Sequence, residues 1–215
     1  MTRRTFAALA LAAPQPSRLL LAEDYNKART YSKEFQSIAP GWRVRTWHGE
    51  WLHTPAGLQS RWTSGHMPVL AYEGSFQDVV IEIEFRYRQE AGRKALCRLS
   101  ATNPGRNPRA YSVSVWANHD SGERPTGLVL EHDEWKPGYV TTVDRKAAQF
   151  VPDTWHKLRL TLTADQATAT SGGLSVTGRF DKFGLPKTLL TIGAGLSPHD
   201  FRHLRVWEGN PVDPA

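Results

Sequence analysis

The sequence contains one cysteine, Cys97, among its 215 residues. A single cysteine excludes an intramolecular disulfide framework and a zinc site built from several cysteines. The chain also lacks an apolar run long enough to cross a bilayer as a helix, so we predict no membrane span in the mature chain. Because a chain of this length can bury a sizeable hydrophobic core, we expect a globular protein that needs no disulfide or metal to fold.

The sequence has little excess charge, with 27 Lys and Arg against 21 Asp and Glu and a formal net charge of +6. Basic residues alternate with acidic ones and form no stripe of one sign. The sequence also contains no phosphate loop, no dinucleotide fingerprint and no nucleophile elbow. We therefore predict no nucleic-acid partner and no cofactor.

The first 22 residues have the layout of an export signal. Arg3 and Arg4 precede an apolar run of small residues, and Ala13 and Ala22 are alternative cleavage points. Residues 2–6 resemble a twin-arginine motif, which directs export of a folded protein. We predict that residues 1–22 are a signal and that residues 23–215 form one exported domain, periplasmic or extracellular.

The rest of the sequence alternates between apolar and polar residues, which is the pattern of half-buried strands. In the segment 79–87, Val79, Ile81 and Ile83 fall on one side. Glu82 and Glu84 fall on the other side, where alternating charge indicates a solvated outer sheet face. Similar strands are predicted at 42–47, 57–62, 94–101, 111–117, 127–131, 155–163, 166–170, 174–179, 188–194 and 201–207. With turn clusters between them, these strands predict an all-β protein, either a two-sheet antiparallel β-sandwich or a barrel.

Several of these segments resemble known jelly rolls. Trp155 at a strand start, a Gly-Gly hairpin over 166–177 and the closing segment 201–206 resemble the concanavalin-like jelly roll. The closing Phe-Arg-His-Leu-Arg-Val is similar to the Phe-Arg-Asn-Ile-Arg-Ile ending of 3-keto-disaccharide hydrolase domains. Residues 110–115 and 126–129 resemble that family's Tyr-Glu-Val-Gln-Ile and Thr-Gly-Ala-Leu-Tyr segments. The likeness covers about residues 40–208, and it implies a jelly-roll fold and hydrolysis of a glycoside or 3-keto-glycoside.

The chain departs from this family at several of the quoted positions, three of which change a polar side chain. Ser112 replaces a glutamate, Ser114 replaces a glutamine and His203 replaces the asparagine of the closing segment. Residues 94–99, Lys-Ala-Leu-Cys-Arg-Leu, replace the family's Asn-Gly-Ile-Phe-Phe-Arg strand and keep at most its arginine, as Arg98. These differences leave a second interpretation open, a non-catalytic carbohydrate-binding or cell-envelope interaction module.

The densest polar cluster runs from Glu131 to Trp135. Carboxylates beside a histidine can act as general acid and base when their surroundings tune them. Laminarinase-type glucanases of the same fold carry three alternating acids on one strand, which point into one groove. Here Glu131 and Asp133 alternate, and tryptophan takes the third position. We predict Glu131 or Asp133 as the acid–base residue, assisted by His132 or His119; a charged loop is the alternative interpretation.

Eight tryptophans favour a carbohydrate partner, because aromatic rings stack on the C–H faces of sugars beside hydrogen-bonding groups. We predict that Arg98, Tyr111 and Trp116 bind substrate, together with Trp135 and Arg109. Core packing is the alternative for any single tryptophan.

Two further expectations follow from position in the sequence. Trp155 opens an apolar strand and is therefore expected in the core. His119, Asp120 and His132 have no spacing known for metal ligands, so we predict no metal site. Calcium bound by Asp and Asn side chains of these loops is the alternative.

Overall fold

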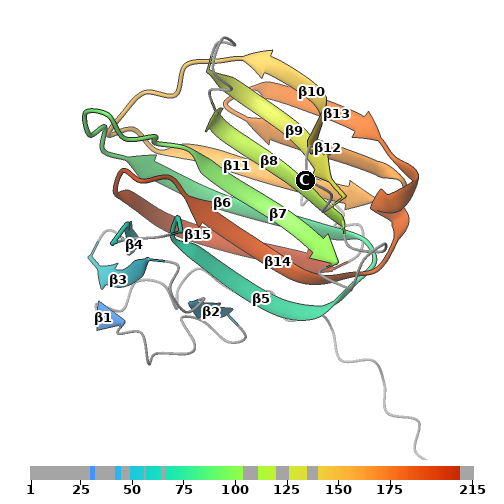
Figure 1. Cartoon of the computed structure of the whole chain (residues 1–215), viewed down its shortest axis with the longest axis horizontal. Helices are drawn as coiled ribbons and strands as arrows, with labels where there is room; N and C mark the ends of the chain where they lie inside the picture. Colours follow the sequence, from blue (N-terminus) through green and yellow to red (C-terminus); the bar gives the residue numbers. More distant parts are fainter. Residues whose placement is uncertain are drawn as a thin grey trace, which may run out of the picture.

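The computed structural model describes residues 30–31, 42–44, 49–55, 57–63, 66–103, 111–119, 126–134 and 140–208. These residues form two antiparallel sheets stacked face to face, and Figure 1 shows β7, β8 and β14 in one layer with β6, β11 and β12 in the other. The predicted all-β, two-sheet sandwich is confirmed. The predicted export signal, residues 1–22, lies outside the described residues.

One sheet has eight strands, among which neighbours in the sheet are antiparallel. In order across the sheet they are β1 (Thr30–Tyr31), β3 (Glu50–Thr54), β4 (Gly57–Arg61), β15 (His199–Glu208), β6 (Val79–Tyr87), β11 (His156–Thr163), β12 (Gln166–Ser171) and β13 (Leu174–Arg179). A 3₁₀ turn, η2 (Asp181–Gly184), follows β13.

The second sheet has seven strands, also paired antiparallel. Across the sheet they are β10 (Val140–Ala147), β9 (Gly127–Asp133), β8 (Tyr111–His119), β7 (Cys97–Asn103), β14 (Lys187–Ala194), β5 (Val69–Phe76) and β2 (Trp42–Val44). Alternation in the sequence did not predict β3, β5 or β10. In β10 no residue is fully buried, so its sequence does not alternate between apolar and polar residues in the way that identifies a strand.

The predicted hairpin is present as β12 and β13, which pair from Gln166–Arg179 to Ser171–Leu174. Gly172 and Gly173 connect the two strands with φ angles of 56° and 80°. Two consecutive residues with positive φ are the requirement of the type I′ turn that matches strand twist, and glycine adopts them without steric cost.

The core lies between the sheets and is built by alternate residues of each strand. On β6, Ile81, Ile83 and Phe85 are buried, and on β7 Cys97 and Leu99 meet them from the other layer. Burial raises the pKa of the Cys97 thiol, which makes a thiolate unavailable for chemistry. Since the odd-numbered residues of β6 fill the core, the even-numbered ones point away from it.

Candidate functional site

Three neighbouring strands of the seven-stranded sheet bring several predicted residues to one outer face. On β7 the core residues Cys97 and Leu99 flank Arg98, so Arg98 points outward. The strand register sets Arg98 opposite Trp116 on β8. The same register sets Ser114 of β8 opposite Glu131 of β9. The site face, as the term is used below, consists of Arg98, Ser114, Trp116, Glu131 and Asp133. Asp133 lies two positions after Glu131 on β9.

Arg98 is fixed in position by its neighbours on β8. Its Nε and Nη2 atoms donate hydrogen bonds of 3.0 and 2.7 Å to Ser114 Oγ. The guanidinium carbon lies 4.8 Å from the centroid of the Trp116 ring, a cation–π contact. The guanidinium therefore has a defined orientation before any ligand arrives.

The electrostatic setting of Arg98 involves both predicted carboxylates. Burial lowers the pKa of Arg98, and the negative charges of Glu131 and Asp133 act in the opposite direction. An arginine in a protein nevertheless keeps its proton. The site face thus combines a partly desolvated cation, two carboxylates of the same surface and an aromatic ring, which suits a ligand with many hydroxyl groups.

A row of small hydroxyl residues crosses this face at right angles to the strands. Thr191 of β14 lies opposite Ser100 of β7, and Ser100 lies opposite Ser114. Ser114 lies opposite Glu131, which in turn lies opposite Thr142 of β10. Ser100 Oγ and Thr191 Oγ1 form a buried hydrogen bond of 2.5 Å. We did not single out Ser100 and Thr191 from the sequence; only the strand register shows that they continue the row of Ser114 and Glu131.

His132 lies on the opposite side of β9 from Glu131 and Asp133. Its ring stacks on Phe180, with centroids 4.0 Å apart and planes 10° apart. Burial lowers the pKa of His132, with smaller and mixed effects from nearby charges. The prediction that His132 assists the two carboxylates is therefore corrected, because successive side chains of a strand point to opposite faces.

The other predicted residues are described only in part. Tyr111 and His119 are the first and last residues of β8, opposite Asn103 and Gly127, and their side chains lie outside the described part of the chain. Arg109 and Trp135 lie wholly outside it. Their predicted roles stay predictions.

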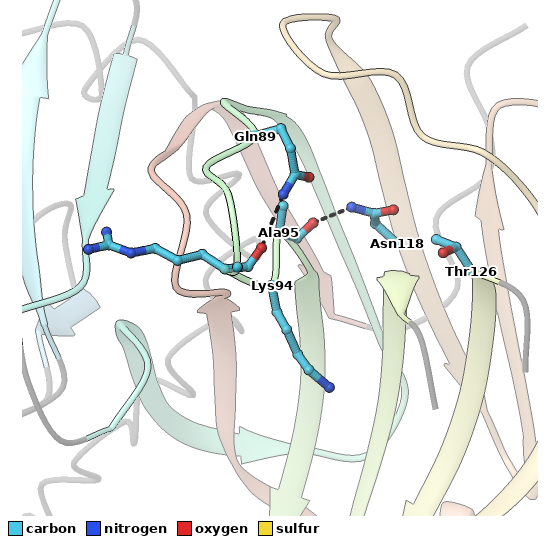
Figure 2. Close-up of a pocket in the computed structure, with 7 residues that line it drawn as sticks. Gln89, Lys94, Ala95, Asn118 and Thr126 are labelled. Carbon is cyan, nitrogen blue, oxygen red and sulfur yellow. Dashed lines mark hydrogen bonds between the residues drawn. The ribbon is translucent and has the colours of Figure 1, made fainter. Parts of the chain in front are cut away.

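A cavity of about 350 Å³ opens at one end of the sandwich, and Figure 2 shows its lining. Asn118 Nδ2 donates to Ala95 O at 2.5 Å, and Gln89 Nε2 donates to Arg93 O at 3.1 Å. Asn118 has a φ of 59°, a left-handed conformation that takes it out of the alternation of β8. Asn118 thus ties the loop between β6 and β7 to β8, and Gln89 closes the loop on itself. The predicted site residues whose side chains the structure describes do not line this cavity.

Two searches of the described residues gave negative results. No group of three or more His, Cys, Asp and Glu side chains in this part of the chain is arranged to hold a metal ion. No helix in the same residues is long and apolar enough to cross a membrane.

Residues 34–206 match the family model of the 3-keto-alpha-glucoside-1,2-lyase-like domain. No curated protein is similar enough in sequence to match the chain.

Solved structures share the fold at low sequence identity. The carbohydrate-binding module CBM66 from Bacillus subtilis has a TM-score of 0.56 at 14% identity, over 79% of this chain and 96% of that one. Bacillus licheniformis beta-glucanase has a TM-score of 0.58 at 8% identity, over 85% and 99%. The Crh5 transglycosylase in complex with NAG has a TM-score of 0.56 at 18% identity, over 89% of this chain and 86% of that one. These similarities establish the jelly-roll fold.

Proposed function

The chain belongs to the 3-keto-alpha-glucoside-1,2-lyase-like domain family, and on this premise we propose that it cleaves the glycosidic bond of a 3-keto-glycoside on the site face. The observation that best supports this proposal is Arg98, held by Ser114 and Trp116 in the electrostatic reach of Glu131 and Asp133. Solved structures of the same fold include a beta-glucanase and a transglycosylase, so the jelly roll is compatible with chemistry on sugars.

The chemistry follows from the substrate's ketone. A carbonyl at C3 makes the hydrogen on C2 acidic, so a carboxylate base can remove that proton and leave an enolate on the C3 oxygen. The electron pair then returns to form a C1=C2 double bond while the C1–O bond breaks, and the leaving oxygen takes up a proton. Addition of water across the double bond completes a net hydrolysis.

The residues of the site face supply the groups that these reaction steps need. Glu131 or Asp133 is the base that takes the C2 proton. Arg98 is the fixed cation beside which the enolate charge develops; such preorganised donors stabilise transition states because they do not reorganise during the reaction. Trp116 offers an apolar surface against a sugar ring.

The proposal is tested by incubating the purified protein with a panel of ordinary and 3-keto-glycosides and measuring free sugar. We expect turnover of keto substrates and a loss of about 10²-fold or more in either Glu131→Gln or Asp133→Asn. Glu84→Gln, a carboxylate on the other sheet, is the matched control and keeps full activity. Full activity in both site-face variants contradicts the acid–base assignment.

A non-catalytic carbohydrate-binding module is the second candidate function. It is favoured by Ser112 and Ser114, which stand where the family segment quoted above has glutamate and glutamine. The fold of CBM66 is also similar. Thermal stabilisation by one glycan of the panel, with no turnover of any, supports this function over the enzyme.

Export remains part of the proposal. Arg3 and Arg4 precede the apolar run as a twin-arginine signal requires. Replacing both by lysine is expected to retain the full-length chain inside the producing cell. N-terminal sequencing of the exported wild-type protein then gives the cleavage point, and export of the double variant at the wild-type level contradicts a twin-arginine route.

A further inference from the structure

The outer face of the eight-stranded sheet carries a dense array of charged residues. On β6, Glu84 lies between Lys157 of β11 and Arg202 of β15 in the strand register. Two residues earlier the arrangement repeats, with Glu82 between one arginine of each neighbouring strand. The side chains of this array, called the cationic face below, are Glu82, Glu84, Arg86, Arg88, Lys157, Arg159, Asp200, Arg202 and Arg205.

The carboxylates lie beneath the cations. Asp200, Glu82 and Glu84 have side chains 3%, 8% and 23% exposed, whereas the six cations are 25–59% exposed. Ion pairs connect the two levels. Those of Glu82 are with Lys157 at 3.4 Å and with Arg159 and Arg205 at 3.9 Å each. Six cations against three carboxylates leave three positive charges in excess, and the cations are the groups that solvent meets.

Trp155 belongs to this face and not to the core, which corrects the expectation from the sequence. It is half-buried, with the guanidinium carbons of Arg202 and Arg86 at 4.0 and 4.9 Å from its ring centroid. Each guanidinium also donates to a carboxylate: Arg202 Nε to Glu84 at 2.7 Å and Arg86 Nη2 to Asp200 at 2.7 Å. Two arginines are thereby held in place before any partner binds, which lowers the entropic cost of binding.

We propose that the cationic face binds an acidic polysaccharide, a chain of carboxylated or sulfated sugars. Parallel to β6, cations recur in steps of about 7 Å, the spacing of every second residue of a strand. Arg88 and Arg86 supply the first two steps, and cations of β11 and β15 supply those beside Glu84 and Glu82. An extended row of charge on a sheet suits an extended polyanion better than a compact ligand. The face lies on the opposite side of the sandwich from the site face (Figure 1).

A polysaccharide fits this face better than a single-stranded nucleic acid. Proteins that bind single strands combine a basic groove with aromatic rings on which bases stack. Among the described residues of the cationic face, the aromatic ring is that of Trp155, and guanidinium groups already contact it. These contacts leave less of the Trp155 ring open to a stacking base, while the cations around it suit an anionic chain.

The test measures binding of polygalacturonate, neutral dextran and single-stranded DNA at low and high salt. The variant replaces Arg88, Lys157 and Arg205 by glutamine, since these are the three most exposed cations of the face. The matched control replaces Arg93, Lys94 and Lys146 by glutamine, which removes the same charge elsewhere on the surface. Arg93 is a close match for Arg205, because it is 41% exposed and paired with Glu90.

We expect wild-type protein to bind polygalacturonate and not dextran, and the affinity to fall about tenfold or more in the variant and less than about twofold in the control. The salt dependence of binding is expected to weaken in the variant. Turnover of a soluble 3-keto-glycoside is measured in parallel and is unchanged, so failure here is distinct from failure of the proposed function. Equal losses in variant and control, absence of polygalacturonate binding, or tighter binding of DNA overturns the proposal.

Discussion

Each outer face of the sandwich carries an arginine stacked on a tryptophan, and the two pairs differ in what else the arginine contacts. Arg98 lies 4.8 Å from the Trp116 ring and donates two hydrogen bonds to the hydroxyl of Ser114. Arg86 lies 4.9 Å from the Trp155 ring and donates two to the carboxylate of Asp200.

The difference indicates separate roles. A hydroxyl orients a guanidinium without neutralising it, whereas a buried carboxylate forms an ion pair whose loss leaves an uncompensated charge. On the site face the guanidinium is oriented by a neutral hydroxyl and lies within the influence of two carboxylates, so a ligand meets positive and negative groups together. On the cationic face the inner ion pairs hold the sheet together, and the outer cations face solvent.

The largest expected effect is on catalysis. Replacing Arg98 by methionine removes the fixed cation, and kcat/KM on a 3-keto-glycoside is expected to fall about 10²-fold or more in protein that is still folded. Arg86→Met is the reciprocal variant, for which we expect normal turnover and a lower Tm. If Arg86→Met loses activity while fully folded, the separation of the two faces is wrong.

The second effect is on stability. Asp200 is 3% exposed, and it accepts hydrogen bonds from Gln59 and Arg86. Asp200→Asn leaves the guanidinium of Arg86 without its counter-charge and is expected to lower the free energy of unfolding by about 2–4 kcal/mol. Asp165→Asn serves as the comparison, because its ion pair with Arg179 is exposed, with an expected cost under about 1 kcal/mol. Urea denaturation measures both, and equal costs would contradict the stabilising role of the buried ion pair on the cationic face.

The sequence predicted the sandwich because alternation marks each strand that contributes one side to the core. It could not predict the charge arrangement, because Glu82 meets its cations from β11 and β15, strands more than 70 residues further along the chain. The same limit applies to the hydroxyl row, in which Thr191 and Ser100 become neighbours only through strand pairing. His132 is a different case, since alternation along β9 already implied that it points away from Glu131. Adjacency in sequence was given too much weight there.

The third effect is a loss of stability at low pH, which we expect from His199, a histidine buried between the two sheets. His199 precedes Asp200 on β15, but its ring packs among Phe85, Tyr87 and Phe201. Burial lowers the pKa of His199 to about 4 from 6.5, against the opposing effects of a hydrogen bond to Ser197 and the charge of Asp200. As the pH falls below 6.5 the unfolded chain binds a proton that the folded chain does not, so stability decreases down to about pH 4.

The measurement is the free energy of unfolding between pH 7 and pH 4 (~3 kcal/mol of loss from His199, at ~1.4 per pH unit). Because burial also lowers the pKa of His132, wild type is compared with His199→Leu over the same range. We expect the pH dependence to be shallower in the variant. If the free energy of unfolding depends on pH as steeply in the variant as in the wild type, groups other than His199 cause the acid sensitivity.

The smallest expected effect tests whether the hydroxyl of Ser114 only positions Arg98. In Ser114→Ala the guanidinium loses the acceptor of two hydrogen bonds, 3.0 and 2.7 Å long, but keeps its contact with Trp116. Activity is expected to fall about five- to tenfold, far less than in Arg98→Met. The guanidinium is displaced in this variant but still present, so it stabilises the enolate less well instead of not at all. Ser114→Thr restores the acceptor and is expected to recover most of the loss. If Ser114→Ala is as inactive as Arg98→Met and threonine does not rescue it, Ser114 contacts the substrate itself. The serine that replaces the family's glutamine would then take part in the reaction.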